Sequence, residues 1–331
     1  MAEHEGVMVY CEMKAGRLAA LTTELLGCGR KLADDLGEAV TAVLIGRGID
    51  GLSQEPIVFG ADKVCVVDSP LFEEYETNSH MLAMEQVVRQ MRPRVLLLGQ
   101  TSVGRDLAPR LAFRLGTAVS TDCVELTIDP DSRQLLQTKP VYGGNAMATF
   151  VCESYPQMAT VRAKAMLSPE PDHSRQGEVV RKDVALEASA IRAKLLQKMP
   201  EKIAGVKLED AKVIVCGGRG IGGTEGFRHL EALANVLKGT VGATRPACDN
   251  GWVPAGLQIG LTGKIVTPDV YIGVAVSGSS QHLSGCSGAK NIVAINKNPN
   301  ANIFNVAHFG VVGDWMQVVP AFIRVLSDEK V

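Results

Sequence analysis

The stretch "KVIVCGGRGIGGTEGFRHLEAL", residues 212–233, decides the fold of the second half of the chain. It reads as an apolar strand, a glycine-rich loop and an amphipathic helix. Gly218, Gly220 and Gly223 match G-x-G-x-x-G, in which backbone N–H groups at a helix N-terminus meet a phosphate. The usual NAD fingerprint has an acidic residue about twenty positions on, and "NVLKGTVGATR" has none. Arg219 suits a pyrophosphate, but a tight turn with a surface arginine explains the loop equally well.

The same strand–helix alternation extends in both directions. After residue 212 it continues through "VYIGVAV", "NIVAINK" and a last helix, "MQVVPAFIRVLSDE". In the first half, strands are expected at "GVMVYCE", "AVTAVLIG", "DKVCVVD", "RVLLLG" and "TAVSTDCVELTID", separated by helical segments such as "RLAALTTELLGCGRKLADDLG" and "SVGRDLAPRLAFRLG". This rhythm predicts mostly parallel, doubly wound sheets with helices on both faces.

Two segments interrupt the pattern. Residues 134–153 and 157–166 look like antiparallel strands around a Gly-Gly turn, and we expect them to extend the first sheet. The charged, helix-prone stretch that follows looks like a connector. We therefore predict an N-terminal α/β domain at 1–190, a connector or hinge at 191–208, and a Rossmann-like or flavodoxin-like domain at 209–331.

Composition excludes several classes of function. A chain of 331 residues favours two domains, and its net charge of −2 leaves no broad basic surface for nucleic acid. No run of eighteen apolar residues exists, so no direct membrane insertion is expected. The N-terminus is acidic and lacks a signal-peptide core, which favours a cytoplasmic protein or the mature form of an organelle protein. The eight cysteines are scattered without a C-x-x-C pair, so we expect structural thiols and no metal site.

Three small-residue loops follow strands of the second domain. They are "GATR", with Thr244 and Arg245, "QIGLTGK", residues 258–264, and "SGSSQH", residues 277–282. Loops at the carboxyl ends of parallel strands converge on one crevice, and these carry side chains suited to a large planar polar ligand. An alternative reading of Arg245 is a surface ion pair. No Ser-His-Asp order or carboxylate pair is evident, so no catalytic residue is predicted.

These loops lie within a longer pattern, "YIGVAVSGSSQHLSGCSGAKNIVAIN", residues 271–296. It resembles the alpha subunit of the electron transfer flavoproteins, also called the FixB family. Further matches are "GGRGIGG", "GATRPACDNGWVP", "IGLTGKIVTPDVY" and "NIFNVAHFGVVGDW", and in the first half "TSVGRDLAPRLAFRLGTAVSTDCVEL" and "PVYGGNAMATFVCESYPQMATVRAKAM". The resemblance covers nearly the whole chain.

The resemblance implies an electron carrier that binds one FAD, mostly in the C-terminal domain. A beta subunit would complete a heterodimer and hold AMP or a second FAD. Electrons would come from acyl-CoA dehydrogenase-like enzymes or NADH and pass to a redox partner such as a quinone or ferredoxin system. Flavin-based bifurcation in the beta subunit stays open.

The resemblance also implies the residues that bind FAD. Arg219 would meet the phosphates, Arg245 would lie beside the isoalloxazine, Thr262 near its N5, and His282 would face its pyrimidine O2. Asn296 and Asp314 would hold the adenosine end. The full implied set is Arg219, Thr244, Arg245, Gln258, Ile259, Gly260, Leu261, Thr262, Ser277, Gly278, Ser279, Ser280, Gln281, His282, Asn296 and Asp314. The loop residues would be small so that backbone can approach the ring and phosphates.

The chain departs from the family pattern at three places. Leu261 stands where the family often has Gln, Ala275-Val276 where it often has Gly-Ile, and Ser279-Ser280 where it often has Ala-Ile. We expect the Leu261 and serine-pair changes to retune the flavin potential without abolishing binding. The alternative functions are an NAD oxidoreductase, which the missing ribose acid disfavours, and a regulatory nucleotide module in the first domain. The single glycine of "VYCEMKAGRLAAL" disfavours the module.

Overall fold

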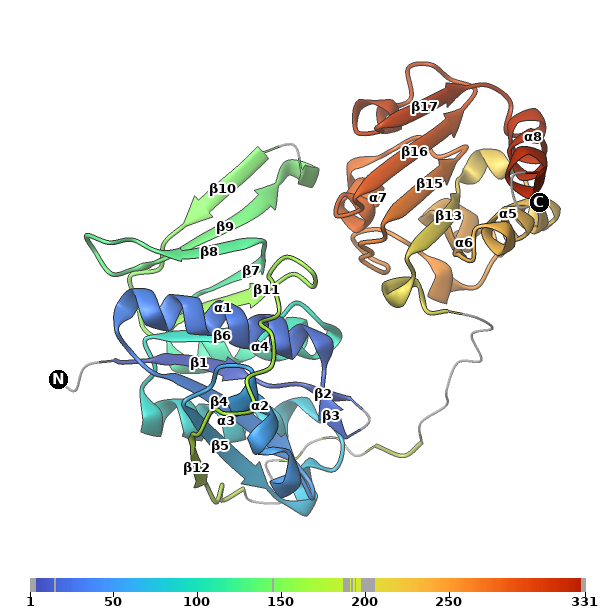
Figure 1. The fold of residues 1–331 in the computed structure, drawn as a ribbon. Coiled ribbons are helices and arrows are strands. Elements are labelled where there is room, and N and C mark those ends of the chain that lie inside the picture. Colours follow the sequence, from blue (N-terminus) through green and yellow to red (C-terminus); the bar gives the residue numbers. More distant parts are fainter. Residues whose placement is uncertain are drawn as a thin grey trace. The chain divides into compact units, whose positions relative to one another are not determined.

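The computed structural model describes residues 4–14, 16–144, 146–186, 191, 193, 195–197 and 206–328. The chain forms two compact units, Met1–Pro140 with Met147–Lys198, and Val141–Ala146 with Met199–Val331. Both are α/β, as predicted (Figure 1). The predicted domain boundaries stay predictions, and the connector at 191–208 lies for the most part outside the described residues. Within the described ranges, no helix is long and apolar enough to cross a membrane.

The first unit is built on a seven-stranded sheet of order β12-β5-β4-β1-β6-β11-β7. All its ladders are parallel. The strands are β1 (Val7–Tyr10), β4 (Val40–Gly46), β5 (Lys63–Asp68), β6 (Val95–Gly99), β7 (Val119–Cys123), β11 (Gln157–Val161) and β12 (Glu178–Arg181). The helices are α1 (Ala20–Leu36), α2 (Gln54–Val58), α3 (Thr77–Met91) and α4 (Ser102–Leu115), and β2 (Met13–Lys14) pairs with β3 (Arg17–Leu18).

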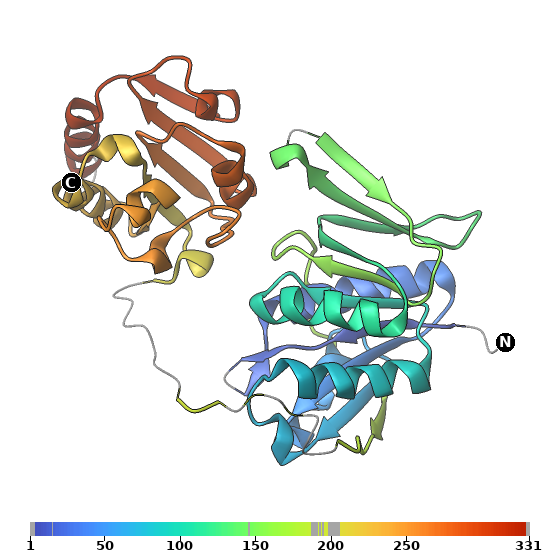
Figure 2. The ribbon, with the colours of Figure 1, turned by 180° about the vertical axis from the view of Figure 1, so that it is seen from behind.

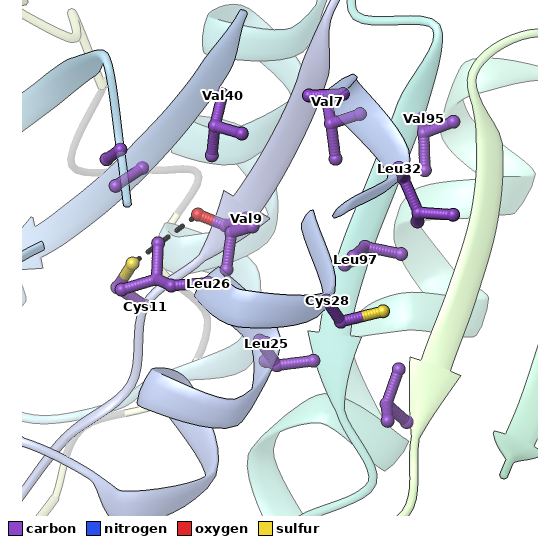
Figure 3. Packing of buried hydrophobic residues seen from close by; sticks show 14 of the residues in the cluster. Val7, Val9, Cys11, Leu25, Leu26, Cys28, Leu32, Val40, Val95 and Leu97 are labelled. Atoms are coloured by element: carbon purple, nitrogen blue, oxygen red, sulfur yellow. Dashed lines mark hydrogen bonds between the residues drawn. The ribbon is translucent and has the colours of Figure 1, made fainter. Parts of the chain in front are cut away.

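Helices cover both faces of this sheet, as the alternation predicts. One face packs on α1, whose Leu25, Leu26 and Leu32 lie against β1 and β6 (Figure 3). The other face packs on α3 and α4, the cyan helices in Figure 2. The left-handed residues Gly37 and Gly116 end α1 and α4, because glycine adopts that conformation without a Cβ penalty.

The predicted antiparallel extension needs correction. Residues 125–150 form a separate three-stranded sheet of β8 (Glu125–Ile128), β9 (Leu135–Val141) and β10 (Ala146–Phe150), not an extension of the main sheet. β11 is parallel and lies between β6 and β7 inside the main sheet. The single strand expected at 117–129 is broken into β7 and β8. There Asp122 turns left-handed, with φ 65°, and its carboxylate accepts two hydrogen bonds from Arg162.

The second unit contains one parallel sheet of order β14-β13-β15-β16-β17. Its strands are β13 (Val213–Gly217), β14 (Thr240–Ala243), β15 (Val270–Val274), β16 (Asn291–Asn296) and β17 (Phe309–Val312). One face packs on α5 (Thr224–Val236), α6 (Arg245–Asp249) and α8 (Trp315–Asp328), and the other on α7 (Ser280–Cys286). In chain order this is the flavodoxin-like arrangement 2-1-3-4-5, and the winding reverses between β13 and β15.

Candidate functional site

A cleft of about 510 Å³ opens at the carboxyl ends of β13, β14 and β15. This is the switch point at which ligands bind in doubly wound sheets. The three predicted loops do converge here, joined by the glycine loop. The lining is Gly218, Arg219, Thr244, Arg245, Pro246, Gln258, Ile259, Gly260, Leu261, Thr262, Val276, Ser277, Gly278, Ser279, Gln281 and His282.

A second, smaller cleft of about 290 Å³ shares Arg219 and Ser277 with the first and contains Asn296 and Asp314. The two clefts therefore meet at the arginine of the glycine loop. Among the predicted residues, Ser280 alone lines neither cleft. It is the first residue of α7, and its hydroxyl donates to Gln281 Oε1 at 3.3 Å.

The charge of the larger cleft is positive. Its two charged lining residues are Arg219 and Arg245, and both side chains are exposed. Arg245 begins α6 and forms an i,i+4 ion pair with Asp249, with 3.3 Å between Nε and Oδ2. That pair is exposed, so it holds the guanidinium only weakly. The surface-pair reading of Arg245 and its place in the cleft are thus both correct, and the cleft favours an anionic ligand.

Three glycines of the site lie against protein backbone. A Cβ at Gly218 would lie 2.1 Å from the carbonyl oxygen of Ala275, and one at Gly278 would lie 2.4 Å from the backbone N of Ile303. A Cβ at Gly285, one turn into α7, would meet Gly260 N at 2.3 Å. These contacts are with protein backbone. Packing between the loops therefore requires glycine at these three positions, and the approach of backbone to a ligand stays a prediction.

Residues 258–266 form a segment that is tied to α7 along its length. The Leu261 N–H donates to Gln281 O at 2.7 Å, and the Val266 N–H donates to Gly285 O at 2.8 Å. Gln258 Nε2 closes the turn by donating to Thr262 Oγ1 at 2.9 Å. At the tip, the Leu261 side chain is 53% exposed. The segment thus presents a fixed backbone to the cleft.

His282 is 6% exposed, and both of its ring nitrogens have hydrogen-bond partners inside the protein. Its Nδ1 lies 3.0 Å from the carbonyl oxygen of Ile259, and its Nε2 lies 2.6 Å from the hydroxyl of Tyr271. Burial lowers the pKa of the imidazole to about 4, so the ring is neutral at pH 7. Both ring nitrogens thus have protein partners, and the expected hydrogen bond from His282 to a flavin O2 stays a prediction.

The polar atoms of the smaller cleft are also partly engaged. Asn296 Nδ2 donates to Val276 O at 2.8 Å, and its Oδ1 accepts from the N–H of Asn298 at 3.0 Å. Asp314 Oδ1 accepts the Met316 N–H at the start of α8. Both residues thus shape the loops around the cleft, in addition to lining it.

The hydroxyl of Thr244 indicates whether the larger cleft fits a flavin nucleotide. This hydroxyl is buried, lines the cleft and has no hydrogen-bond partner among the described residues. Such an atom costs free energy unless something bonds it. A ring with carbonyl and imino groups along its edge supplies such a bond, and the arginines suit its phosphates. The residues present therefore fit FAD.

Sequence reasoning missed two features of the site. Tyr271 was noted only as part of a pattern, although a tyrosine in the middle of a buried aliphatic strand needs a partner for its hydroxyl. Ala275, at the end of β15, has φ 53°, a conformation that costs a residue with a Cβ about 1–2 kcal/mol. The family glycine usually found there was the available signal.

Comparison with known proteins gives consistent results over both units. Residues 7–187 match the Electron transfer flavoprotein domain, and residues 207–287 match the Electron transfer flavoprotein FAD-binding domain. The electron transfer flavoprotein subunit alpha of Thermoanaerobacterium thermosaccharolyticum is 45% identical over the full length of both chains. That of Bacillus subtilis is 40% identical over 95% of each chain, and Protein FixB of Clostridium saccharobutylicum is 39% identical over 98% of this chain and 96% of its own. The chain belongs to the electron transfer flavoprotein alpha subunit family.

Proposed function

We propose that this chain binds FAD in its second unit and, together with a beta subunit, carries electrons from acyl-CoA dehydrogenase-like enzymes or NADH to a redox partner. The observation that carries this proposal is the pair of joined clefts at the switch point. Two arginines line the larger one, and a buried threonine hydroxyl there has no hydrogen-bond partner in the part of the chain that the structure describes. A flavin supplies one- and two-electron redox chemistry when bound, and the chain itself needs no acid or base for it.

The shape of the site suggests how FAD is oriented. Arg219 lines both clefts, so the pyrophosphate would lie at their junction. The isoalloxazine would then occupy the larger cleft, against the backbone of 259–262, and the adenosine would occupy the smaller one near Asn296. Thr244 would donate to or accept from the ring edge, which satisfies its orphaned hydroxyl.

Arg245 would set the electrostatics of the ring. A fixed cation near a group that gains negative charge on reduction stabilises the reduced form. At about 4 Å the effect would be about 4 kcal/mol at an effective dielectric of 20, but only about 1 kcal/mol in water. Because the side chain is 65% exposed and paired with Asp249, the smaller figure is the better guide.

A partner subunit is supported by exposed apolar strands. All four residues of the edge strand β17 are exposed, with Phe309 at 66%. On β10 of the other unit, Met147 and Phe150 are also exposed. An uncovered apolar edge strand is an aggregation hazard in a monomer, and the relatives' names describe one subunit of a larger assembly. We therefore propose that the beta subunit covers one or both of these strands.

The test is to co-express the chain with the protein of the neighbouring gene and record absorbance during stepwise reduction. One FAD per complex, or one FAD with AMP, would support the carrier. A second FAD that titrates separately would favour bifurcation. A complex that assembles but contains no flavin would contradict the proposal and favour the alternative, an oxidoreductase that binds NAD at the glycine loop. A Phe309→Lys or Phe150→Lys variant that assembles as well as the parent would exclude that strand from the interface.

A further inference from the structure

Tyr271 contacts His282, which lines the larger cleft. It belongs to β15, its side chain is fully buried, and its hydroxyl is 2.6 Å from His282 Nε2. Cys216 Sγ on β13 lies 4.0 Å from the same nitrogen of His282, and Cys286 on α7 belongs to the same buried cluster. These four side chains form a buried polar cluster in an otherwise apolar layer, and no role in binding has so far been given to Tyr271.

The hydrogen bonds of this cluster have only one consistent direction when the ring is neutral. A carbonyl oxygen only accepts, so the proton of His282 must be on Nδ1, which donates to Ile259 O. Nε2 then has no proton and can only accept, which requires Tyr271 to donate its hydroxyl proton. Nε2 therefore accepts from the hydroxyl of Tyr271 on β15.

Burial keeps the side chains of this cluster uncharged. Burial raises the pKa of Tyr271 and of Cys216, and raises that of Cys286 to about 12. The titratable groups facing the imidazole from β13, β15 and its own helix are thus neutral near pH 7. Ile259 offers it only a backbone carbonyl. The ring is held by hydrogen bonds and not by a counter-charge.

We propose that Tyr271 is a positioning residue: it fixes His282 in the Nδ1–H tautomer, and His282 in turn fixes the backbone of 259–262 that lines the cleft. The chain of contacts runs from the Tyr271 hydroxyl through the imidazole to the Ile259 carbonyl. The neighbouring Leu261 N–H is bonded to Gln281, the residue before the histidine. That this backbone contacts a bound flavin rests on the proposed function. The tautomer of His282 and the conformation of residues 259–262 do not depend on it.

The test uses the full chain, without flavin and then in the flavin-loaded complex. Nitrogen-15 NMR of histidine in the parent should show a protonated Nδ1 and an unprotonated Nε2 for His282. In Tyr271→Phe, the Nε2 resonance should move, and exchange of the Leu261 amide should quicken about two- to tenfold, the effect of losing one buried hydrogen bond. Tyr10→Phe, which removes a buried phenol hydroxyl in the other unit, is the matched control and should change neither.

Two substitutions of the histidine separate positioning from filling of space. His282→Asn places an amide N–H near the position of Nδ1 and should largely keep the slow exchange of Leu261. His282→Gln places its amide near the position of Nε2, so the slow exchange of the Leu261 amide should be lost. A parent with Nε2–H, or a Tyr271→Phe variant with unchanged imidazole signals and exchange, would overturn the inference. A chain with the expected tautomer that binds no FAD would instead defeat the proposed function alone.

Discussion

Replacing Gly278 by alanine tests why the loops of the site are built from glycine. Gly278 has φ 80°, and a Cβ there would lie 2.4 Å from Ile303 N and 2.7 Å from its Cα. Gly222, in the glycine loop, has a similar φ of 87°, but a Cβ there meets nothing within 4 Å. Alanine at either position must therefore adopt a left-handed conformation, but only alanine at Gly278 also clashes with backbone.

The two costs can be estimated separately. An alanine in the left-handed region costs about 1–2 kcal/mol, and this is all that Gly222→Ala should lose. Gly278→Ala adds an overpacking cost of about 1–3 kcal/mol, because backbone at Ile303 cannot swing aside like a flexible side chain. We expect a total loss of about 2–5 kcal/mol in the free energy of unfolding of the second unit.

Urea unfolding of the flavin-free chain measures this loss. The two tryptophans, Trp252 and Trp315, both lie in the second unit, so their fluorescence follows that unit without assuming that the whole chain unfolds in one step. Gly278→Ala should lower the midpoint by on the order of 1–2 M. If it lowers the midpoint no more than Gly222→Ala and only weakens FAD retention, the glycine serves ligand approach and our packing argument is wrong.

Four further outcomes are expected. Arg245→Ala should lower the one-electron potential of the oxidised flavin/semiquinone couple by about 40 mV, whereas Arg228→Ala, an exposed control on α5, should not change it. An unchanged potential in Arg245→Ala would show that Arg245 does not lie beside the ring. Leu261→Gln should shift the potential, and a match to the parent in a redox titration would count against any tuning role. Ala275→Gly should raise the free energy of unfolding by up to about 1 kcal/mol, and with it the urea midpoint, because glycine adopts the φ of 53° without strain. As the pH falls from 6.5 to 4, the free energy of unfolding of the parent should fall by up to about 3 kcal/mol more than that of a His282→Asn variant. The reason is that the imidazole takes up a proton in the unfolded chain but not in the folded one. Parallel pH profiles of the two proteins would contradict this.

Much of the fold could be predicted because its signals are local. The alternation of apolar runs with amphipathic helices predicts both parallel sheets, and Gly37 and Gly116 mark the ends of α1 and α4. The pairing of strands is not local. β11 reads as a hairpin strand because a Gly-Gly turn precedes it, yet it is inserted between β6 and β7. The break at Asp122 depends on Arg162, forty residues away, and no local pattern announces it.

The positions of the site were predictable for a related reason. Residues that follow parallel strands gather at one edge of the sheet whatever their detailed contacts, so "GATR", "QIGLTGK" and "SGSSQH" meet as expected. What each residue does there depends on which of its atoms the protein has already bonded. That inventory is a property of the folded state, and a sequence gives the donors and acceptors without their partners.

His282 and Thr244 show the two sides of this inventory. The histidine looks like the more obvious ligand-binding side chain, yet both its nitrogens are used, by Ile259 and Tyr271. The threonine looks like filler before an arginine, yet its hydroxyl is buried in the cleft and unbonded. A buried unsatisfied atom gains more from a ligand than an atom that must first give up a partner. The hydrogen bonds that select the cofactor should therefore come from Thr244 and the loop backbone, while His282 holds that backbone in place.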